Sequence, residues 1–193
     1  MDESQLVERA RRGDTGAYDA LVQAHQEAAF RAAYLITHDA AEAQDAAQEA
    51  FIRAYDALGR FDARRPFRPW LLRIVTNLAI NHVRASQRRQ TMAERYGVQS
   101  IERQEMPAVE AHVLSRERSR RVWSAIGRLK PEDQRLLVLR YFLDLSEAEL
   151  AQAFDAAAGT IKSRLHRALG KLRDAIHAHD PDLLESKFPV VRE

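Results

Sequence analysis

The 193-residue sequence has no cysteine and contains only 7 glycines and 6 prolines. Without cysteine the chain cannot form a disulfide, a thiolate metal site, a cysteine nucleophile or a thiol-based redox sensor. No apolar run approaches the roughly 20 residues needed to cross a bilayer, and residues 1–4 do not begin a secretion signal. These absences predict a cytoplasmic protein with no membrane insertion.

Few glycines and prolines, and no alternating run of β-branched residues, argue against β-sheets. Apolar residues instead recur at spacings of three and four, which is typical of amphipathic helices. Residues 91–112 lose this periodicity. The sequence therefore predicts an all-α protein of two small helical domains joined by a flexible linker. The first domain covers 1–90, the linker 91–112, the second domain 113–180 and a frayed tail 181–193.

In the first domain we expect helices over about 4–12, 17–37, 39–58 and 69–90. Asp39 followed by Glu42 is a capping-box pattern, which marks the start of the third helix. Pro69 suits the first position of the fourth helix, where its missing N–H costs nothing. An apolar stripe from Trp70 to Val83 predicts a strong apolar face for this helix, and it favours packing over DNA stacking for Trp70.

Charge is distributed unevenly around these helices. Residues 38–59 hold five acids and one arginine, whereas residues 60–95 hold nine arginines and two acids. An acidic helix followed by a basic one predicts two surfaces that face different partners.

The second domain contains a helix-turn-helix pattern. Lys130-Pro131 begins a helix, and Ser146 with Glu149 is a second capping box, opening a short helix over 146–154. After a turn at 155–157, a longer helix runs to about 177, and its 160–173 segment has five Lys or Arg and no acid. Its core-facing side is predicted to hold Ile161, Leu165, Ala168, Leu169 and Leu172. A short helix, a tight turn and a basic helix are typical of a protein that binds in the DNA major groove.

Several of these segments resemble a known family. The segment DAAQEAFIRAY (45–55) resembles the second conserved region of bacterial sigma factors, and PWLLRIVTN (69–77) resembles their promoter-melting helix. LSEAELA (145–151) with GTIKSRLHRA (159–168) is similar to region four. The short spacer between the two blocks resembles the extracytoplasmic function (ECF) group of the sigma-70 family.

The resemblance implies an alternative sigma factor that binds core RNA polymerase, through the β′ clamp helices and the β flap, and directs it to promoter −10 and −35 elements. Its implied partners also include promoter DNA and an anti-sigma factor. The clamp-helix contacts would be Asp45, Gln48, Glu49 and Ile52. The −10 contacts would be Phe61, Asp62, Ala63, Arg64, Arg65, Arg73 and Asn77. The −35 contacts would be Thr160, Lys162, Ser163, Arg164, His166 and Arg167.

Some alternatives remain open from the sequence. Phe61 lies in a loop, so packing and DNA contact are both possible. The whole chain could be a free-standing helix-turn-helix regulator, although no heptad seam supplies the dimer such a regulator needs, or a polymerase-bound protein without DNA contact. His177, His179 and Asp180 lack further ligands for a metal. No catalytic motif is present, so we expect no enzyme activity, no cofactor and no metal.

Overall fold

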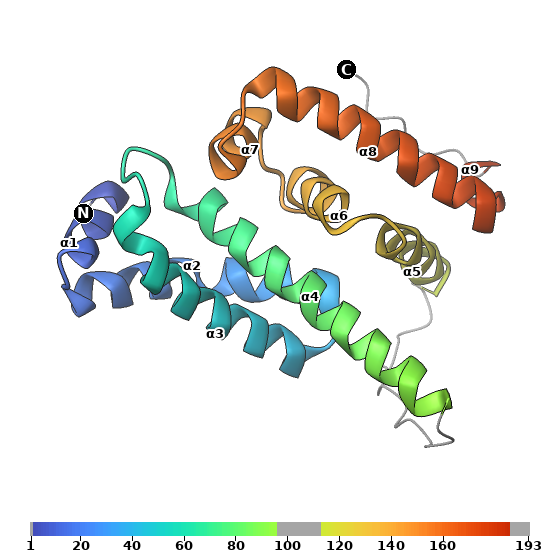
Figure 1. The fold of residues 1–193 in the computed structure, drawn as a ribbon, viewed down its shortest axis with the longest axis horizontal. Coiled ribbons are helices and arrows are strands. Elements are labelled where there is room, and N and C mark those ends of the chain that lie inside the picture. The colour runs from blue at the N-terminus through green and yellow to red at the C-terminus, as the bar shows by residue number, and fades with distance from the viewer. Residues whose placement is uncertain (1, 96–112, 186–193) are drawn as a thin grey trace.

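The computed structural model describes residues 2–95 and 113–185, and every regular element in these ranges is a helix (Figure 1). The first half contains α1 (Glu3–Arg11), α2 (Thr15–Thr37), α3 (Ala40–Ala57), the 3-10 turn η1 (Leu58–Arg60) and α4 (Phe67–Arg95). The second half contains α5 (Val113–Gly127), α6 (Pro131–Leu137), the π-helical segment η3 (Val138–Phe142), α7 (Glu147–Phe154), α8 (Ala158–His179) and α9 (Asp182–Glu185). The all-α prediction is confirmed.

Helices α3 and α7 begin at the caps that the sequence predicts. The Asp39 carboxylate accepts a hydrogen bond from the Glu42 backbone N–H at 2.9 Å. Ser146 and Glu149 form the full reciprocal capping box: the Glu149 N–H donates to Ser146 Oγ, and the Ser146 N–H donates to Glu149 Oε2. These bonds satisfy backbone donors that the first helical turn leaves free.

The core of the first half is built on small side chains. Seven alanines of α2 and α3 are fully buried, each 0 % exposed: Ala29, Ala32, Ala33, Ala43, Ala46, Ala50 and Ala54. Methyl side chains let two helix backbones approach closely, so α2 and α3 pack along an alanine seam. Where α2 begins, the Tyr18 hydroxyl donates to the Phe51 carbonyl at 2.5 Å, and burial raises the pKa of Tyr18.

Helix α4 is longer than predicted. It begins at Phe67 rather than Pro69 and continues to Arg95, beyond the predicted end at residue 90. Pro69 is thus the third helical residue, where a missing N–H still leaves no intrahelical hydrogen bond unmade. The first residues of the predicted linker 91–112 are therefore helical, and 96–112 lie outside the described residues.

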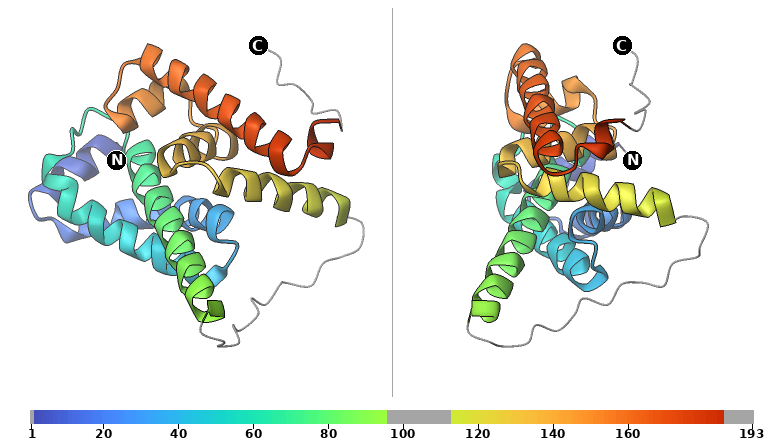
Figure 2. Two further views of the ribbon diagram at one scale, coloured as in Figure 1. Left: turned by 45° about the vertical axis from the view of Figure 1, so that its right-hand side comes forward. Right: turned by 90° about the vertical axis from the view of Figure 1, so that its right-hand side faces the viewer.

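Helix α4 lies between two layers of helices, with α2 and α3 on one side and α6, η3 and α7 on the other (Figures 1 and 2). The predicted stripe of α4 is buried, as at Leu71 and Val75, but Leu72 and Ile80 outside that stripe are buried as well. The second half of the chain also packs against α4, so burial on this helix extends beyond the predicted face. One hydrophobic cluster extends across both halves.

The segment after Pro181 is more ordered than the predicted frayed tail at its start. Asp182–Glu185 form α9, and Leu183 is buried against Ala125 and Ile176. Residues 186–193 lie outside the described part of the chain. Within the described ranges, none of the helices is long and apolar enough to cross a membrane.

Candidate functional site

The outer face of α3 carries the residues predicted to bind polymerase. Asp45, Gln48 and Ile52 are exposed, and Ile52 keeps 63 % of its surface open. Tyr55 is exposed on the same helix, so Ile52 is part of a small apolar patch beside acidic and amide groups, a combination that suits contact with another protein. The buried alanine seam on the opposite side of α3 holds this face outward.

Glu49, the fourth residue of this set, is only partly exposed and has two partners. Its Oε1 accepts from Arg53 Nη2 at 2.5 Å, and its Oε2 lies 3.1 Å from His82 Nε2 on α4. Burial raises the pKa of the Glu49 carboxyl, but the hydrogen bonds from Arg53 and His82 outweigh it, so the net pKa is lowered. The carboxylate is therefore ionised at neutral pH and joins α3 to α4.

Beside this face lies a hollow that sequence reasoning missed. It has a volume of about 370 Å³ and is lined by Thr15, Tyr18, Asp19, Phe51, Ile52 and Tyr55. Tyr55 is exposed, and its ring meets Tyr18 edge-on with centroids 4.8 Å apart. The available signal was spacing: Tyr55 follows Ile52 by three residues, so both lie on one face of a helix.

The loop before α4 contains five of the predicted −10 residues. Phe61 is 5 % exposed and packs against the rings of Phe67 and Trp70, so the structure places Phe61 in the core. Trp70 also packs there, as predicted. Ala63 is half-buried, whereas the Arg64 side chain is 91 % exposed.

Asp62 fixes the shape of this loop. Its carboxylate accepts from the Arg64 guanidinium at 2.9 and 3.0 Å and from the Arg64 backbone N–H at 3.1 Å. These hydrogen bonds lower the pKa of Asp62 to about 2. The Asp62 side chain is thus turned toward its own loop.

The other predicted −10 residues contact the second half of the chain. Arg65 Nη2 donates to Asp155 Oδ1 at 2.8 Å, and Arg73 donates to the Ala153 carbonyl. The amide oxygen of Asn77 accepts from Arg135 Nη1 at 2.7 Å. Each of these three residues thus contacts the second half, Arg65 and Arg73 at the end of α7 and Asn77 at α6.

The basic face of α8 is open. Lys162, Ser163, Arg164, His166 and Arg167 are exposed and Thr160 is half-buried, while Ile161, Leu165 and Ala168 are buried as predicted. Leu169 was wrongly assigned to the core side: it is 39 % exposed.

Two side chains of this face are oriented by their own helix. Ser163 Oγ donates to the Thr160 carbonyl at 2.9 Å, and Arg167 Nε donates to the Ser163 carbonyl at 3.3 Å. Ala157 occupies the N-cap of α8 and offers no side-chain hydrogen bond.

In the part of the chain that the structure describes, no three His, Asp or Glu side chains are grouped as metal ligands. Asp180, considered above with His177 and His179, is instead paired with Arg121 at 2.9 Å.

Two family models match the chain, one to each half. Sigma-70 region 2 matches residues 21–89, and Sigma-70 region 4 matches residues 119–172. The RNA polymerase sigma-H factor of Pseudomonas aeruginosa is 41 % identical over 175 residues, which cover 86 % of this chain and 89 % of that protein. The ECF RNA polymerase sigma factor SigW of Bacillus subtilis is 31 % identical, over 86 % of this chain and 92 % of that protein.

A solved structure has the same fold. CnrH, determined in complex with the cytosolic domain of CnrY, is 26 % identical and superposes with a TM-score of 0.60, covering 92 % of this chain and 99 % of that chain.

These matches define a helical transcription-initiation subunit. The chain belongs to the ECF group of the sigma-70 family of RNA polymerase sigma factors. It is an alternative sigma factor that directs promoter-specific transcription initiation, and a free-standing helix-turn-helix regulator is not favoured.

Proposed function

We propose that separate surfaces of this sigma factor carry out polymerase docking, −10 capture and −35 recognition in the cytoplasm. The docking surface is the outer face of α3, with Asp45, Gln48, Glu49 and Ile52 against the β′ clamp helices of core RNA polymerase. Ile52 supplies apolar area that is out of water only in the complex. The carboxylates of Asp45 and Glu49 supply charge complementarity to a basic partner. Tyr55 extends the same surface.

The −10 surface consists of the loop 62–65 and the side of α4 that carries Arg73 and Asn77. Opening a duplex unstacks bases at a cost of a few kcal/mol, which a pocket for the flipped base offsets. Asn77 offers an amide for a base edge, while Arg64, Arg65 and Arg73 offer cations for the displaced strand. Asp62 shapes the loop, with Ala63 beside the base. We assign Phe61 to the core and not to DNA.

The −35 surface is the exposed face of α8. Its first turns enter the major groove, where Lys162, Ser163, His166 and Arg167 face base edges and Arg164 and Thr160 face the backbone. The second half also binds the β flap. It forms one domain, residues 113–180, and residues 1–90 form the other.

We further propose that an anti-sigma factor holds the free protein inactive, since the sigma factor RpoE from Bartonella quintana, which has a similar fold, was determined in complex with the anti-sigma factor NepR. The chain itself performs no chemistry and needs no cofactor or metal. The observation that carries the proposal is the separation of the surfaces: acidic and apolar groups on α3, cations on α8.

The deciding experiment mixes the purified chain with core RNA polymerase and follows it with run-off transcription from a genomic promoter library. A stable complex that transcribes a defined promoter set supports the proposal. A folded, inhibitor-free chain that fails to bind polymerase yet binds a duplex site by itself would contradict it.

A further inference from the structure

The loop before α4 and the start of α4 hold the end of the first helix of the helix-turn-helix. Arg65 Nη1 donates to the Gln152 carbonyl at 3.2 Å, and Arg73 Nη1 donates to the Ala153 carbonyl. Both carbonyls lie in the last turn of α7, at the negative end of the helix dipole. The Asp155 backbone N–H also donates to the Gln152 carbonyl, at 3.4 Å. The Asp155 carboxylate adds an ion pair with Arg65 at 2.8 Å. Two arginines from one half thus cap a helix of the other.

The same side of α4 makes two further contacts with the second half. Positions 73, 77 and 84 fall on one face of an α-helix. Arg135 on α6 donates to the Asn77 amide oxygen at 2.7 Å, and Arg84 Nη2 donates to the Leu129 carbonyl at 2.8 Å. The polar groups of this face are therefore engaged along about three turns of helix.

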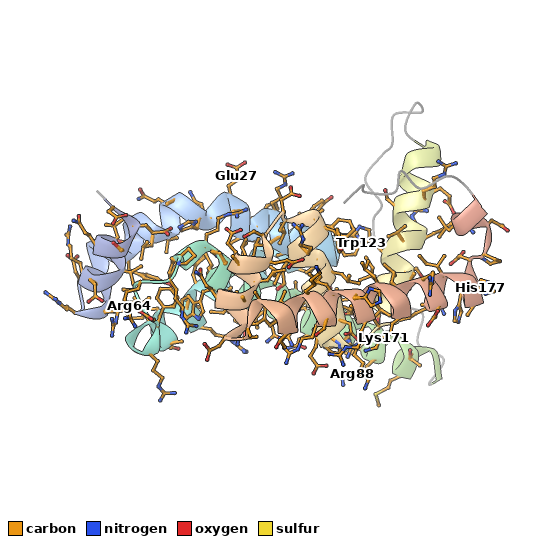
Figure 3. All side chains as sticks on the ribbon, turned by 90° about the horizontal axis from the view of Figure 1, so that it is seen from above. Glu27, Arg64, Arg88, Trp123, Lys171 and His177 are labelled. Atoms are coloured by element: carbon orange, nitrogen blue, oxygen red, sulfur yellow. The ribbon has the colours of Figure 1, made fainter. Side chains whose placement is uncertain are left out.

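Contacts with aromatic rings accompany these hydrogen bonds. The Arg73 guanidinium lies over the Phe154 ring, 5.5 Å from its centroid. At the other end of the contact, Trp123 on α5 meets the His38 ring edge-on with centroids 5.3 Å apart; Figure 3 shows Trp123 where α5 approaches the end of α2. Burial of aromatic surface supplies most of the free energy of such contacts, because exposed ion pairs contribute little.

We propose that, in the free chain, the second half binds this face of α4 and the preceding loop as an internal partner, so that the −10 surface opens only when the halves separate. The inference rests on the proposed DNA role of Arg65, Arg73 and Asn77. The phosphates of a DNA strand and the C-terminal carbonyls of α7 both present oxygen acceptors at negative potential. Both therefore bind the same guanidinium groups, those of Arg65 and Arg73. DNA at the −10 surface and the second half therefore compete.

Two features of Arg135 destabilise the contact between the two halves. Within the described residues, the buried Nε of Arg135 has no hydrogen-bond partner. Burial, and then the nearby charge of Arg73, lower the pKa of Arg135. A buried unsatisfied donor and two neighbouring cations both destabilise the contact. Separation of the halves removes both unfavourable terms, so a polyanion such as DNA can displace the second half from α4.

Distance measurement tests closure directly. The chain lacks cysteine, so Glu27→Cys and Asp174→Cys introduce one exposed attachment site for a spin label in each half. The distance between the two labels then reports whether the halves are in contact. Opening is forced by Trp123→Ala with Asp155→Gly, two changes outside the proposed polymerase and DNA surfaces. Asp155 has a φ of 50°, which glycine adopts freely.

The matched control, Phe30→Ala with Asp133→Ala, also removes one aromatic ring and one carboxylate. Its lost contacts, Phe30 with Tyr34 and Lys171 with Asp133, lie within single halves. Circular dichroism confirms that each variant is folded.

We expect a narrow distribution of the label-to-label distance for the labelled chain without further changes and for the control. The opening variant should give a broad distribution centred at a longer distance. A distribution that is already broad in the unmodified chain, and unchanged by opening, overturns the proposal.

The second measurement is the affinity for a short fluorescent single-stranded DNA of mixed sequence. Opening should increase it about tenfold or more, as it does when the competent form is at most about a tenth of the free population. The control should bind as the unmodified chain does. Equal affinity in the closed and opened chains would show that the halves pack without competing with DNA, and would overturn the proposal.

Failure of the proposed −10 surface gives a different result. Asn77→Ala and Arg73→Ala, added to the opened chain, would then leave strand binding unchanged, although opening itself still increased it. In that case the closed form covers some other strand-binding group of the first half.

Discussion

Glu49 on α3 and His82 on α4 are joined by a 3.1 Å contact between Oε2 and Nε2. The helix proposed to bind polymerase is thereby tied to the helix proposed to open DNA. The two acidic members of the docking surface consequently differ: Asp45 is exposed, whereas Glu49 has both an outer neighbour, Arg53, and a structural role.

Charge reversal at these two positions should separate binding from stability. Asp45→Lys should weaken binding to core polymerase by about tenfold or more and leave unfolding by urea unchanged, because only a charge facing the partner is lost. Glu49→Lys should weaken binding and also lower the free energy of unfolding by up to about 1 kcal/mol, since Arg53 and His82 then face a cation. Anisotropy titration and urea melts measure the two effects.

The matched control is Glu27→Lys on α2, whose side chain projects outward (Figure 3). It should alter neither quantity. Normal polymerase affinity of Asp45→Lys would contradict the docking assignment.

Asn77 should act at promoter opening. Asn77→Ala should reduce run-off transcription from a duplex promoter by about tenfold, because an amide that pairs with a flipped base is lost. A template that is already melted over the −10 element should restore most of the activity. Asn81→Ala, an exposed asparagine about one turn further along α4, is the control. An equal deficit on both templates would instead assign Asn77 a structural role.

Lys162 and Arg167 should determine affinity for the −35 element. Their joint replacement by alanine should weaken holoenzyme binding to a duplex −35 fragment by about 2 kcal/mol or more, through lost base and phosphate contacts. The dependence of affinity on salt should also become shallower, because fewer counterions are released. Arg173→Ala removes an exposed cation near the other end of α8 and should change affinity far less. Unchanged promoter output from the double variant would refute this surface.

Acid should weaken the capping box of α7. The Ser146 backbone N–H is the main cause that lowers the pKa of Glu149 from its usual 4.5. The folded pKa is therefore below the unfolded one, so the stabilisation is fully present above pH 4.5 and is lost as the pH falls through the folded pKa. Urea unfolding of Glu149→Gln should show a deficit near neutral pH that narrows in acid. A deficit independent of pH would mean that the ionised carboxylate is not what matters.

Gly170 should be replaceable with a gain in stability. It is an interior residue of α8, and nothing lies within 4 Å of where its Cβ would stand. Gly170→Ala should raise the free energy of unfolding by roughly 0.5–1 kcal/mol, because glycine loses more backbone conformational entropy than alanine when it folds into a helix. Gly13 also has free space but a φ of +92°, so Gly13→Ala should be destabilising. Thermal or urea melts check the opposite signs.

Local features of this fold could be predicted from the sequence. The caps at Asp39 and Ser146, and the buried side of α8 at Ile161 and Leu165, follow from spacing within one helix. Leu169 was misplaced because helical periodicity gives only the direction in which a side chain points. It does not tell how far the neighbouring helices extend to cover that side, and Leu169 is 39 % exposed. Phe61 could not be decided from the sequence, because its neighbours Phe67 and Trp70 contact it only once the loop has turned back.

The contacts of α4 with the second half were beyond sequence reasoning. Its arginines form a basic segment, which is typical of a DNA-facing helix. Nothing in the local pattern indicates that the carbonyls of α7, some 80 residues later, accept from Arg73. Backbone acceptors are the same in every sequence, so such pairs leave no trace in residue identity.

The alanine seam between α2 and α3 decides where this protein can change. Replacing one of these buried methyl groups by a larger side chain costs about 1–3 kcal/mol, and no smaller side chain except hydrogen exists. Substitutions that keep this packing are therefore those at exposed positions, such as Asp45, Gln48 and Ile52 on the outer face of α3. A substitution on the exposed face of α3 therefore leaves the interior of this sigma factor as it is, whichever partner that face meets.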